Sequence, residues 1–118
     1  MNYGKNVWIF PDAELPPKGD NLIPGHESII ITNVSDSKAH ITVTLIYTDK
    51  EPLRFPTEVE SMRVRCLRTN EAKDFGAYTA RQDEQYAIML ESDVPVVAQY
   101  GRAEPRDVHF YTTPGYCE

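Results

Sequence analysis

Alternation of apolar and polar side chains is clearest between Ala39 and Tyr47. Every second residue from Ala39 onward is apolar or aromatic, and most of the residues between them are His or Thr. A period of two places one set on a buried face of a β-strand and the other mostly on a solvated face. Residues 27–33 are also rich in β-branched side chains, and the polar segment 34–38 separates the two. The pattern predicts two antiparallel strands joined by a turn.

Proline and glycine mark the breaks between the other segments. Residues 12–25 are rich in both, which predicts a loop because proline removes backbone donors and restricts φ. Pro56 interrupts residues 55–59, so this segment is expected to be an edge strand at most. Residues 75–85 fit no single pattern, and an irregular segment, a short helical turn or a strand at Tyr78 all stay open.

Two further segments have a predicted arrangement of their own. Residues 62–68 alternate again, which places Met62, Val64 and Cys66 opposite three residues that include two arginines. We expect the arginines to face outward and Cys66 to be a small buried side chain. Only Asp93 separates residues 86–92 from residues 94–101, which predicts two strands joined by a tight turn.

Together these segments predict an all-β fold. The chain of 118 residues is expected to form one domain over residues 1–118. The expected architecture is a single antiparallel β-sandwich of about seven to eight short strands, with a small barrel as the related alternative. The predicted strands are residues 7–10, 27–33, 39–47, 55–59, 62–68, 86–92, 94–101 and 108–113.

Charge and hydropathy exclude several function classes. The formal net charge is -6, which argues against nucleic-acid binding and against docking on an anionic membrane surface. An acidic surface still suits the basic cytoplasmic loops of a membrane protein. No apolar run approaches the ~20 residues of a membrane helix, and residues 7–10 are too short for a signal peptide. We expect a cytoplasmic protein with no direct membrane insertion.

Cysteines and histidines give no strong sign of a catalytic or metal centre. Two cysteines, Cys66 and Cys117, make a disulfide framework improbable and fit a reducing compartment. His26 and Glu27 with Asp49 or Glu51 would supply metal ligands, but the spacing does not require a site and solvated histidines are the better interpretation. No Gly-x-Ser-x-Gly elbow is present. We therefore expect no enzyme, no cofactor and no metal.

Carboxylates and aromatic residues are the better candidates for binding. Asp49 and Glu51 stand in a turn before Pro52, where the simplest interpretation is a solvated turn and the alternative is a binding loop. An aromatic face with amides, carboxylates and an arginine is typical of saccharide-binding surfaces. The same side chains can equally form the core, because a lone Trp in a small domain is usually buried. The candidates for such a face are Trp8, Tyr47, Gln99, Tyr100 and Arg102.

Several of these segments together resemble the sensory rhodopsin transducer family. The strand from Ala39-His40 into Tyr47-Thr-Asp-Lys-Glu-Pro52 resembles a family segment, as does Ser92-Asp-Val-Pro-Val-Val-Ala-Gln-Tyr-Gly-Arg102. No single motif is decisive, but their order and spacing are fairly specific, and the resemblance covers nearly the whole chain apart from residues 70–85. Further matches are Trp8 with residues 15–19, residues 25–33, residues 59–68 and residues 112–116.

The resemblance implies a β-sandwich that assembles into a homotetramer and, in the namesake, a cytoplasmic protein that relays signals from a membrane photoreceptor. The family's fold is also similar to carbohydrate-binding sandwiches. Two departures from the family pattern affect a partner surface near the end of the chain. Glu104 stands where the family often has Asp, and the segment 102–116 looks shorter than in the namesake. Carried over by position, the ligand-binding residues are Glu27, Asn33, Tyr47, Asp49, Glu51, Arg63, Gln99 and Arg102.

Two hypotheses follow. The first is a transducer-like signalling adaptor whose surface docks on the cytoplasmic face of a membrane receptor or on another protein. The second is a binding module for a sugar-like or other small polar ligand, unrelated to rhodopsin. An enzyme acting on a sugar is a weaker third, based on Asp49 and Glu51. The sugar hypothesis requires an exposed Trp8 or Tyr47 beside Glu27, Gln99 and Arg102 in one solvent-accessible pocket.

Overall fold

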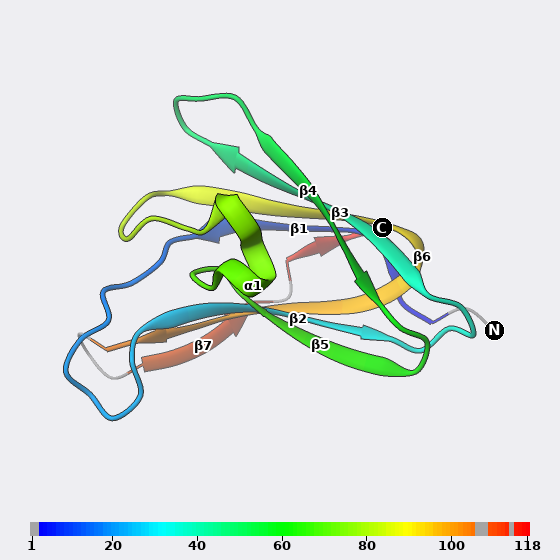
Figure 1. Cartoon of the computed structure of the whole chain (residues 1–118), viewed down its shortest axis with the longest axis horizontal. Helices are drawn as coiled ribbons and strands as arrows, with labels where there is room; N and C mark the ends of the chain where they lie inside the picture. The colour runs from blue at the N-terminus through cyan, green and yellow to red at the C-terminus, as the bar shows by residue number, and fades with distance from the viewer. Residues whose placement is uncertain (1–2, 106–108, 114) are drawn as a thin grey trace.

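The computed structural model describes residues 3–105, 109–113 and 115–118. Over these residues the chain forms eight β-strands, with a short α-helix and a 3-10 helix between the fifth and sixth strands (Figure 1). The all-β prediction is confirmed. The elements are β1 (Lys5–Ala13), β2 (His26–Asn33), β3 (Ala39–Tyr47), β4 (Leu53–Val59), β5 (Arg63–Arg68), α1 (Ala72–Phe75), η1 (Gly76–Tyr78), β6 (Tyr86–Glu104), β7 (His109–Thr113) and β8 (Tyr116–Cys117).

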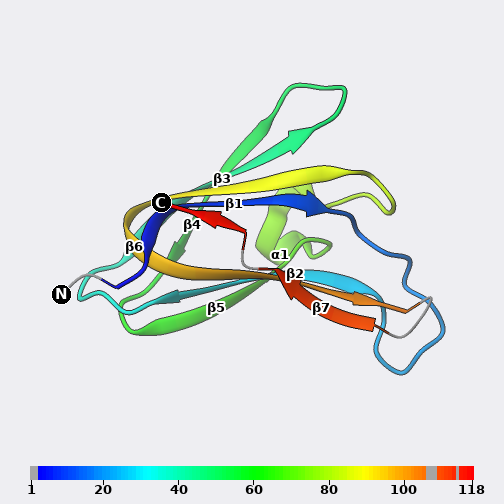
Figure 2. The ribbon, with the colours of Figure 1, turned by 180° about the vertical axis from the view of Figure 1, so that it is seen from behind.

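The strands form two layers that share β6. One layer has the order β4-β3-β6-β1-β8, and the other has the order β5-β2-β6-β7. Every ladder between these strands is antiparallel. Figures 1 and 2 show the two layers from opposite sides, with the β3–β4 hairpin extending past the rest of the first layer. The strands β4 and β5 are therefore both edge strands, and α1 lies beside them.

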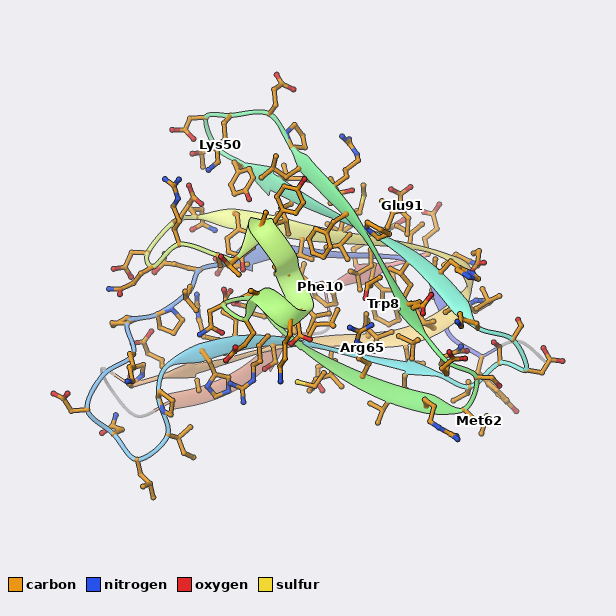
Figure 3. All side chains as sticks on the ribbon, in the orientation of Figure 1. Trp8, Phe10, Lys50, Met62, Arg65 and Glu91 are labelled. Carbon is orange, nitrogen blue, oxygen red and sulfur yellow. The ribbon has the colours of Figure 1, made fainter. Side chains whose placement is uncertain are left out.

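Side chains from both layers fill the interior. The buried face predicted for β3 is confirmed, since Ile41, Val43 and Leu45 are buried whereas His40 and Thr42 are exposed. Thr44, predicted on the solvated face, is buried as well. Phe10 is fully buried, and its ring centroid lies 6.3 Å from that of Trp8. In Figure 3 the side chains of Trp8 and Phe10 lie between the layers, whereas Lys50 and Met62 lie at the periphery. Each fully buried aliphatic or aromatic side chain contributes about 1.5–3 kcal/mol to stability.

The predicted tight turn at Asp93 is wrong, because β6 is one long bent strand. Its first half pairs with β1 and β3, and its second half pairs with β2 and β7. A two-residue hairpin requires positive φ angles, and no residue of β6 has one. The β1–β6 register shifts between the pairs Lys5↔Val96 and Val7↔Glu91. The strand changes layers at this irregularity, which includes Pro95.

The predicted faces of β5 are also wrong for residues 64–67, although Arg63 is exposed as expected. Val64 and Cys66 are exposed, Leu67 is buried, and Arg65 is half-buried and bonded to β4. A one-residue change in strand phase moves every side chain to the opposite face. The sequence was ambiguous because both faces of this segment carry an apolar residue. The deeper burial of Leu67 decides the phase, and Cys66 is consequently an exposed thiol.

Other differences lie at the ends of elements. β1 continues past Pro11, which lies at a register shift between Phe10 and Ala13. Residues 116–117 form an unpredicted strand on the free edge of β1, where Trp8 pairs with Cys117. The last predicted strand is β7, although its first predicted residue, Val108, lies outside the described residues. In the uncertain segment 75–85, η1 and the last residue of α1 show that a helical turn was the correct alternative, and the rest of α1 lies just before the segment.

Candidate functional site

The eight predicted binding residues lie in five places. Glu27 and Arg102 are paired across β2 and β6, so the structure brings these two together. The others are more dispersed, and none of the eight lines the groove described below. Their role in ligand binding stays a prediction. The five places are the interior (Glu27, Arg102), the β2–β3 turn (Asn33), the β3–β4 hairpin (Tyr47, Asp49, Glu51), the start of β5 (Arg63) and the outer face of the second layer (Gln99).

Glu27 is a fully buried carboxylate held by four hydrogen-bond donors. Its Oε1 accepts bonds from the Thr69 hydroxyl at 2.9 Å and the Tyr86 hydroxyl at 2.7 Å. Its Oε2 accepts bonds from the backbone N–H of Glu14 at 2.9 Å and from the hydroxyl of Tyr100. A buried carboxylate without such donors would be costly. This cluster connects β2, both halves of β6 and two loops.

The two tyrosines of this cluster are adapted to act as donors. Burial raises the pKa of Tyr86 well above its usual value, and the Glu27 carboxylate raises it further. Burial and then Glu27 raise the pKa of Tyr100 in the same direction. Both effects disfavour a phenolate next to a carboxylate. The hydroxyls therefore keep their protons and their bonds to Glu27 throughout the neutral pH range.

Arg102 joins the same region through the backbone of Glu14. Its Nη1 donates to the Glu14 carbonyl oxygen at 3.1 Å, while the Glu14 N–H donates to Glu27. The side chain is half-buried. Glu27 and Arg102 thus fix the start of the loop after β1, and within the described contacts their function is to hold this loop on β2 and β6.

Asn33 is a buried amide that shapes the β2–β3 turn. Its Nδ2 donates to the carbonyl oxygens of Ser37 at 2.9 Å and Val59 at 3.0 Å. Its Oδ1 accepts bonds from the backbone N–H of Ser35 at 2.9 Å and from the Ser35 hydroxyl at 2.7 Å. This is the local geometry in which asparagine favours turns. The contacts of Asn33 account for its position without a ligand.

The β3–β4 hairpin presents an acidic tip. Asp49 and Glu51 are exposed, whereas Lys50 bends back, with Nζ 3.0 Å from Glu84 Oε2 and 4.1 Å from the centroid of the Tyr47 ring. Burial raises the pKa of Tyr47, and Glu84 raises it further. Lys50, which stands between the two acidic residues, is engaged, so the tip presents two carboxylates outward, with Arg54 exposed further along at the start of β4. Figure 1 shows how far this hairpin projects beyond the layers.

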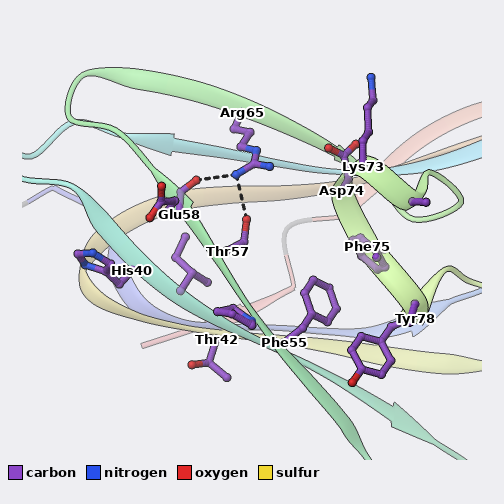
Figure 4. A pocket seen from close by; sticks show the side chains of 15 residues that line it. His40, Thr42, Phe55, Thr57, Glu58, Arg65, Lys73, Asp74, Phe75 and Tyr78 are labelled. Atoms are coloured by element: carbon purple, nitrogen blue, oxygen red, sulfur yellow. Dashed lines mark hydrogen bonds between the residues drawn. The ribbon is translucent and has the colours of Figure 1, made fainter.

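A groove of about 570 Å³ lies between β4, β5 and α1. Three aromatic rings form one wall: the centroid of Phe55 lies 5.0 Å from that of Phe75 and 5.6 Å from that of Tyr78. Arg65 lies on the other side (Figure 4). Sequence reasoning missed this groove because it placed Arg65 outward and left residues 70–85 unassigned. The three-residue spacing of Phe75 and Tyr78, typical of a helical turn, was the available signal.

Trp8 does not provide the exposed ring that the sugar hypothesis required. The side chain is buried, and its Nε1 donates to the carbonyl oxygens of Val96 at 3.0 Å and Lys5 at 3.2 Å. Tyr47 is half-buried against Tyr86. The polar residues proposed to accompany these rings do not converge beside them. The described geometry therefore gives the sugar hypothesis no specific support.

Two of the histidines, His26 and His40, have local partners. His40 is exposed, as expected, and its backbone N–H and Nδ1 lie 2.8 Å and 2.9 Å from the two carboxylate oxygens of Asp93. The backbone N–H of His40, followed by its imidazole, lowers the pKa of Asp93. His26 Nδ1 lies 2.8 Å from the Pro24 carbonyl oxygen. Within the described ranges, no group of His, Cys, Asp and Glu side chains is arranged to hold a metal ion.

The fold and its surfaces define a small antiparallel β domain with a projecting acidic hairpin and an open groove. The chain belongs to the family described as Anabaena sensory rhodopsin transducer, whose model matches residues 3–116. A comparison with curated proteins finds no match. None of the helices in the described residues has the length and apolar character needed to cross a membrane.

Two solved structures are similar over almost their whole length. The crystal structure of Thermotoga maritima 1070 has a TM-score of 0.84 and 34% sequence identity, covering 100% of this chain and 97% of that one. The Anabaena sensory rhodopsin transducer has a TM-score of 0.76 and 29% identity, covering 90% of this chain and 94% of its own. The family resemblance recognised in the sequence is thus confirmed.

Proposed function

We propose that this chain is a transducer-like signalling adaptor that works in the cytoplasm, catalyses no reaction and docks on the cytoplasmic face of a membrane receptor. Membership of the Anabaena sensory rhodopsin transducer family and the similarity to that transducer's structure support the adaptor role. Following that name, a sensory rhodopsin is the first receptor to test. The observation that carries the docking site is the acidic tip of the β3–β4 hairpin.

Charge explains why this tip suits a receptor. Asp49 and Glu51 are exposed, while Lys50 is engaged by Glu84 and the Tyr47 ring. The cytoplasmic loops of membrane proteins carry an excess of Lys and Arg. Complementary charges accelerate encounter and orient the partners, and salt weakens the effect. A projecting acidic hairpin can reach such loops while the body of the domain, with the chain's net charge of -6, stays away from the anionic lipid surface.

Neutralising the tip is expected to weaken receptor binding. The double variant Asp49→Asn/Glu51→Gln removes two exposed carboxylates, so association with a sensory rhodopsin in lipid nanodiscs should slow about tenfold at low salt. The difference from the wild type should shrink as salt rises. Biolayer interferometry at several salt concentrations, in the dark and under illumination, measures both effects.

The matched control is Asp20→Asn/Asp36→Asn, which changes the net charge equally at two exposed positions on other loops. It should retain most of the wild-type association rate. An equal loss in both double variants would rule out the hairpin as the docking site. Wild-type protein that binds the rhodopsin neither in the dark nor in the light would contradict the receptor assignment.

We also propose that the chain assembles into a homotetramer through the outer face of the second layer. The copy number comes from the family resemblance. The face is supported by two uncharged cross-strand rows, Val64–Thr32–Val97 and Cys66–Ile30–Gln99. Val64 and Val97 are 63% and 45% exposed. Contiguous exposed apolar side chains commonly mark interaction surfaces, and copies that each carry a charge of -6 need an uncharged face to meet.

Introducing a charge on this face is expected to dissociate the assembly. In Val64→Asp, each interface would bury an unpaired carboxylate, so sedimentation velocity should detect smaller species at micromolar concentration. Val34→Asp is the control, because Val34 is exposed but lies in the β2–β3 turn outside the two rows. A wild-type monomer, or an assembly that Val64→Asp leaves intact, would contradict the proposed interface.

A further inference from the structure

The groove between β4, β5 and α1 combines an apolar wall with a cationic side. The wall consists of Phe55, Phe75 and Tyr78, and the neighbouring centroids of these rings are 5.0 Å and 5.6 Å apart. Figure 4 shows the rings gathered at one end of the groove and the Arg65 guanidinium at the other. A volume of about 570 Å³ falls in the range of small-molecule sites, which is about 300–1,000 Å³.

The Arg65 guanidinium is held in place but only partly used. Its Nη1 donates to Thr57 Oγ1 at 3.1 Å and to the Glu58 carbonyl oxygen at 2.9 Å. Both acceptors are neutral, and no carboxylate of the described residues forms an ion pair with this side chain. The Nε–Nη2 edge has no hydrogen bond to the described residues. This edge is a planar pair of donors that matches both oxygens of a carboxylate.

The other charged groups of the groove do not cancel this cation. The Asp74 carboxylate accepts the backbone N–H of Arg68 at 2.9 Å. The Glu58 carboxylate is engaged by Lys38, whose Nζ lies 3.4 Å away. Lys73 is exposed at the rim and, like Arg65, forms no ion pair with the described residues. His40 bonds Asp93. The formal charges of these four side chains sum to zero, but both carboxylates have other partners, so Arg65 and Lys73 are the cations left open to an anion.

We propose that this groove binds a small organic carboxylate that carries an apolar group. The carboxylate pairs with the Nε–Nη2 edge of Arg65, and the apolar group packs on the rings of Phe55 and Tyr78. Tyr78, which is half-buried, offers the open ring of this wall, whereas Phe55 and Phe75 are only 9% and 1% exposed and support it from the interior. An open aromatic ring gains from a packed hydrocarbon or aromatic group. This site goes beyond the adaptor role, and none of its lining residues belongs to the hairpin tip.

Phenylacetate and its neutral counterpart phenylacetamide are the probes. In two-dimensional amide NMR titrations, phenylacetate is expected to shift residues along β4, the Arg65 segment and α1, with a millimolar Kd typical of so small a ligand. Phenylacetamide has nearly the same shape but no charge, so it should bind about tenfold more weakly. Equal affinity of the two probes, or shifts outside the groove only, would overturn the proposal.

Arg65→Met is expected to weaken phenylacetate binding about tenfold or more, because it removes the donor edge. Arg63→Met is the matched control: it loses the same charge from the same strand, and Arg63 does not line the groove. It should bind like the wild type. If both variants lose the same amount of phenylacetate affinity, the effect depends only on the net charge of the protein, and the carboxylate site is overturned.

Arg65 also bonds β4, so a folding defect in Arg65→Met needs a second test. Arg65→Lys keeps the charge without the planar pair of donors and should also weaken binding. Tyr78→Ser removes part of the apolar wall from a half-buried position and should weaken phenylacetate severalfold. Thermal melting verifies each fold. If folded Arg65→Lys and Tyr78→Ser bind phenylacetate with wild-type affinity, the proposal is overturned. The hairpin variant Asp49→Asn/Glu51→Gln should keep full affinity for phenylacetate, which separates this site from receptor docking.

Discussion

Glu27→Gln is expected to lower the free energy of unfolding by about 2–5 kcal/mol. The wild-type carboxylate accepts four hydrogen bonds, from Thr69, Tyr86, Tyr100 and the backbone of Glu14. Glutamine replaces one of the two oxygens with an NH₂ group, so this donor would face the hydrogen-bond donors that the oxygen accepts in the wild type. The side chain is fully buried, so water cannot replace the lost acceptor. Urea unfolding followed by circular dichroism measures the change.

The matched control is Glu91→Gln, which makes the same chemical change at an exposed position of β6. It is expected to change stability by less than about 0.5 kcal/mol. Because folded proteins have only about 5–15 kcal/mol of stability, Glu27→Gln removes a large share of the total. A loss of less than about 1 kcal/mol in Glu27→Gln would contradict the view that this carboxylate organises the interior.

Stability is expected to fall steeply once the pH rises above about 10. In the unfolded chain a tyrosine loses its proton near its usual pKa of 10.0, whereas burial and Glu27 keep Tyr86 and Tyr100 protonated in the fold. Above this pH the unfolded state therefore binds fewer protons than the folded state, and stability decreases as the pH rises. Each tyrosine contributes a slope of about 1.4 kcal/mol per pH unit.

Urea unfolding at a series of alkaline pH values measures this slope. Tyr86→Phe and Tyr100→Phe should each reduce it by about 1.4 kcal/mol per pH unit, and the double variant should lose about twice as much. The slope is the informative quantity, because each variant also loses a hydrogen bond to Glu27 at every pH. Single and double variants that keep the wild-type slope would show that these tyrosines do not titrate differently in the two states.

The sequence by itself was sufficient where the signal is local. The alternation in residues 39–47 predicted both the bounds and the buried face of β3, because a strand buried on one face requires a period of two. Pro56 marked β4 as an edge strand, since proline has no N–H for a second neighbour. The order of several such segments was also enough to recognise the family.

Tertiary structure decided the features that depend on distant partners. β6 is one strand rather than two because β1 and β3 pair with one half while β2 and β7 pair with the other. The faces of β5 depend on which of two apolar sets packs against the interior. The groove exists only because α1 folds against Phe55, which is far from it in the sequence.

The predicted site shows the same division. The sequence identified Glu27, Arg102 and the acidic residues of the hairpin as unusual polar positions, but it did not determine their environments. The four donors to Glu27 come from residues 14, 69, 86 and 100, and their convergence is a property of the packed layers. Local pattern determines which side chains a strand can bury. The pairing of distant segments decides which polar groups come together, because a polar group buried away from water needs a hydrogen-bond partner within the protein.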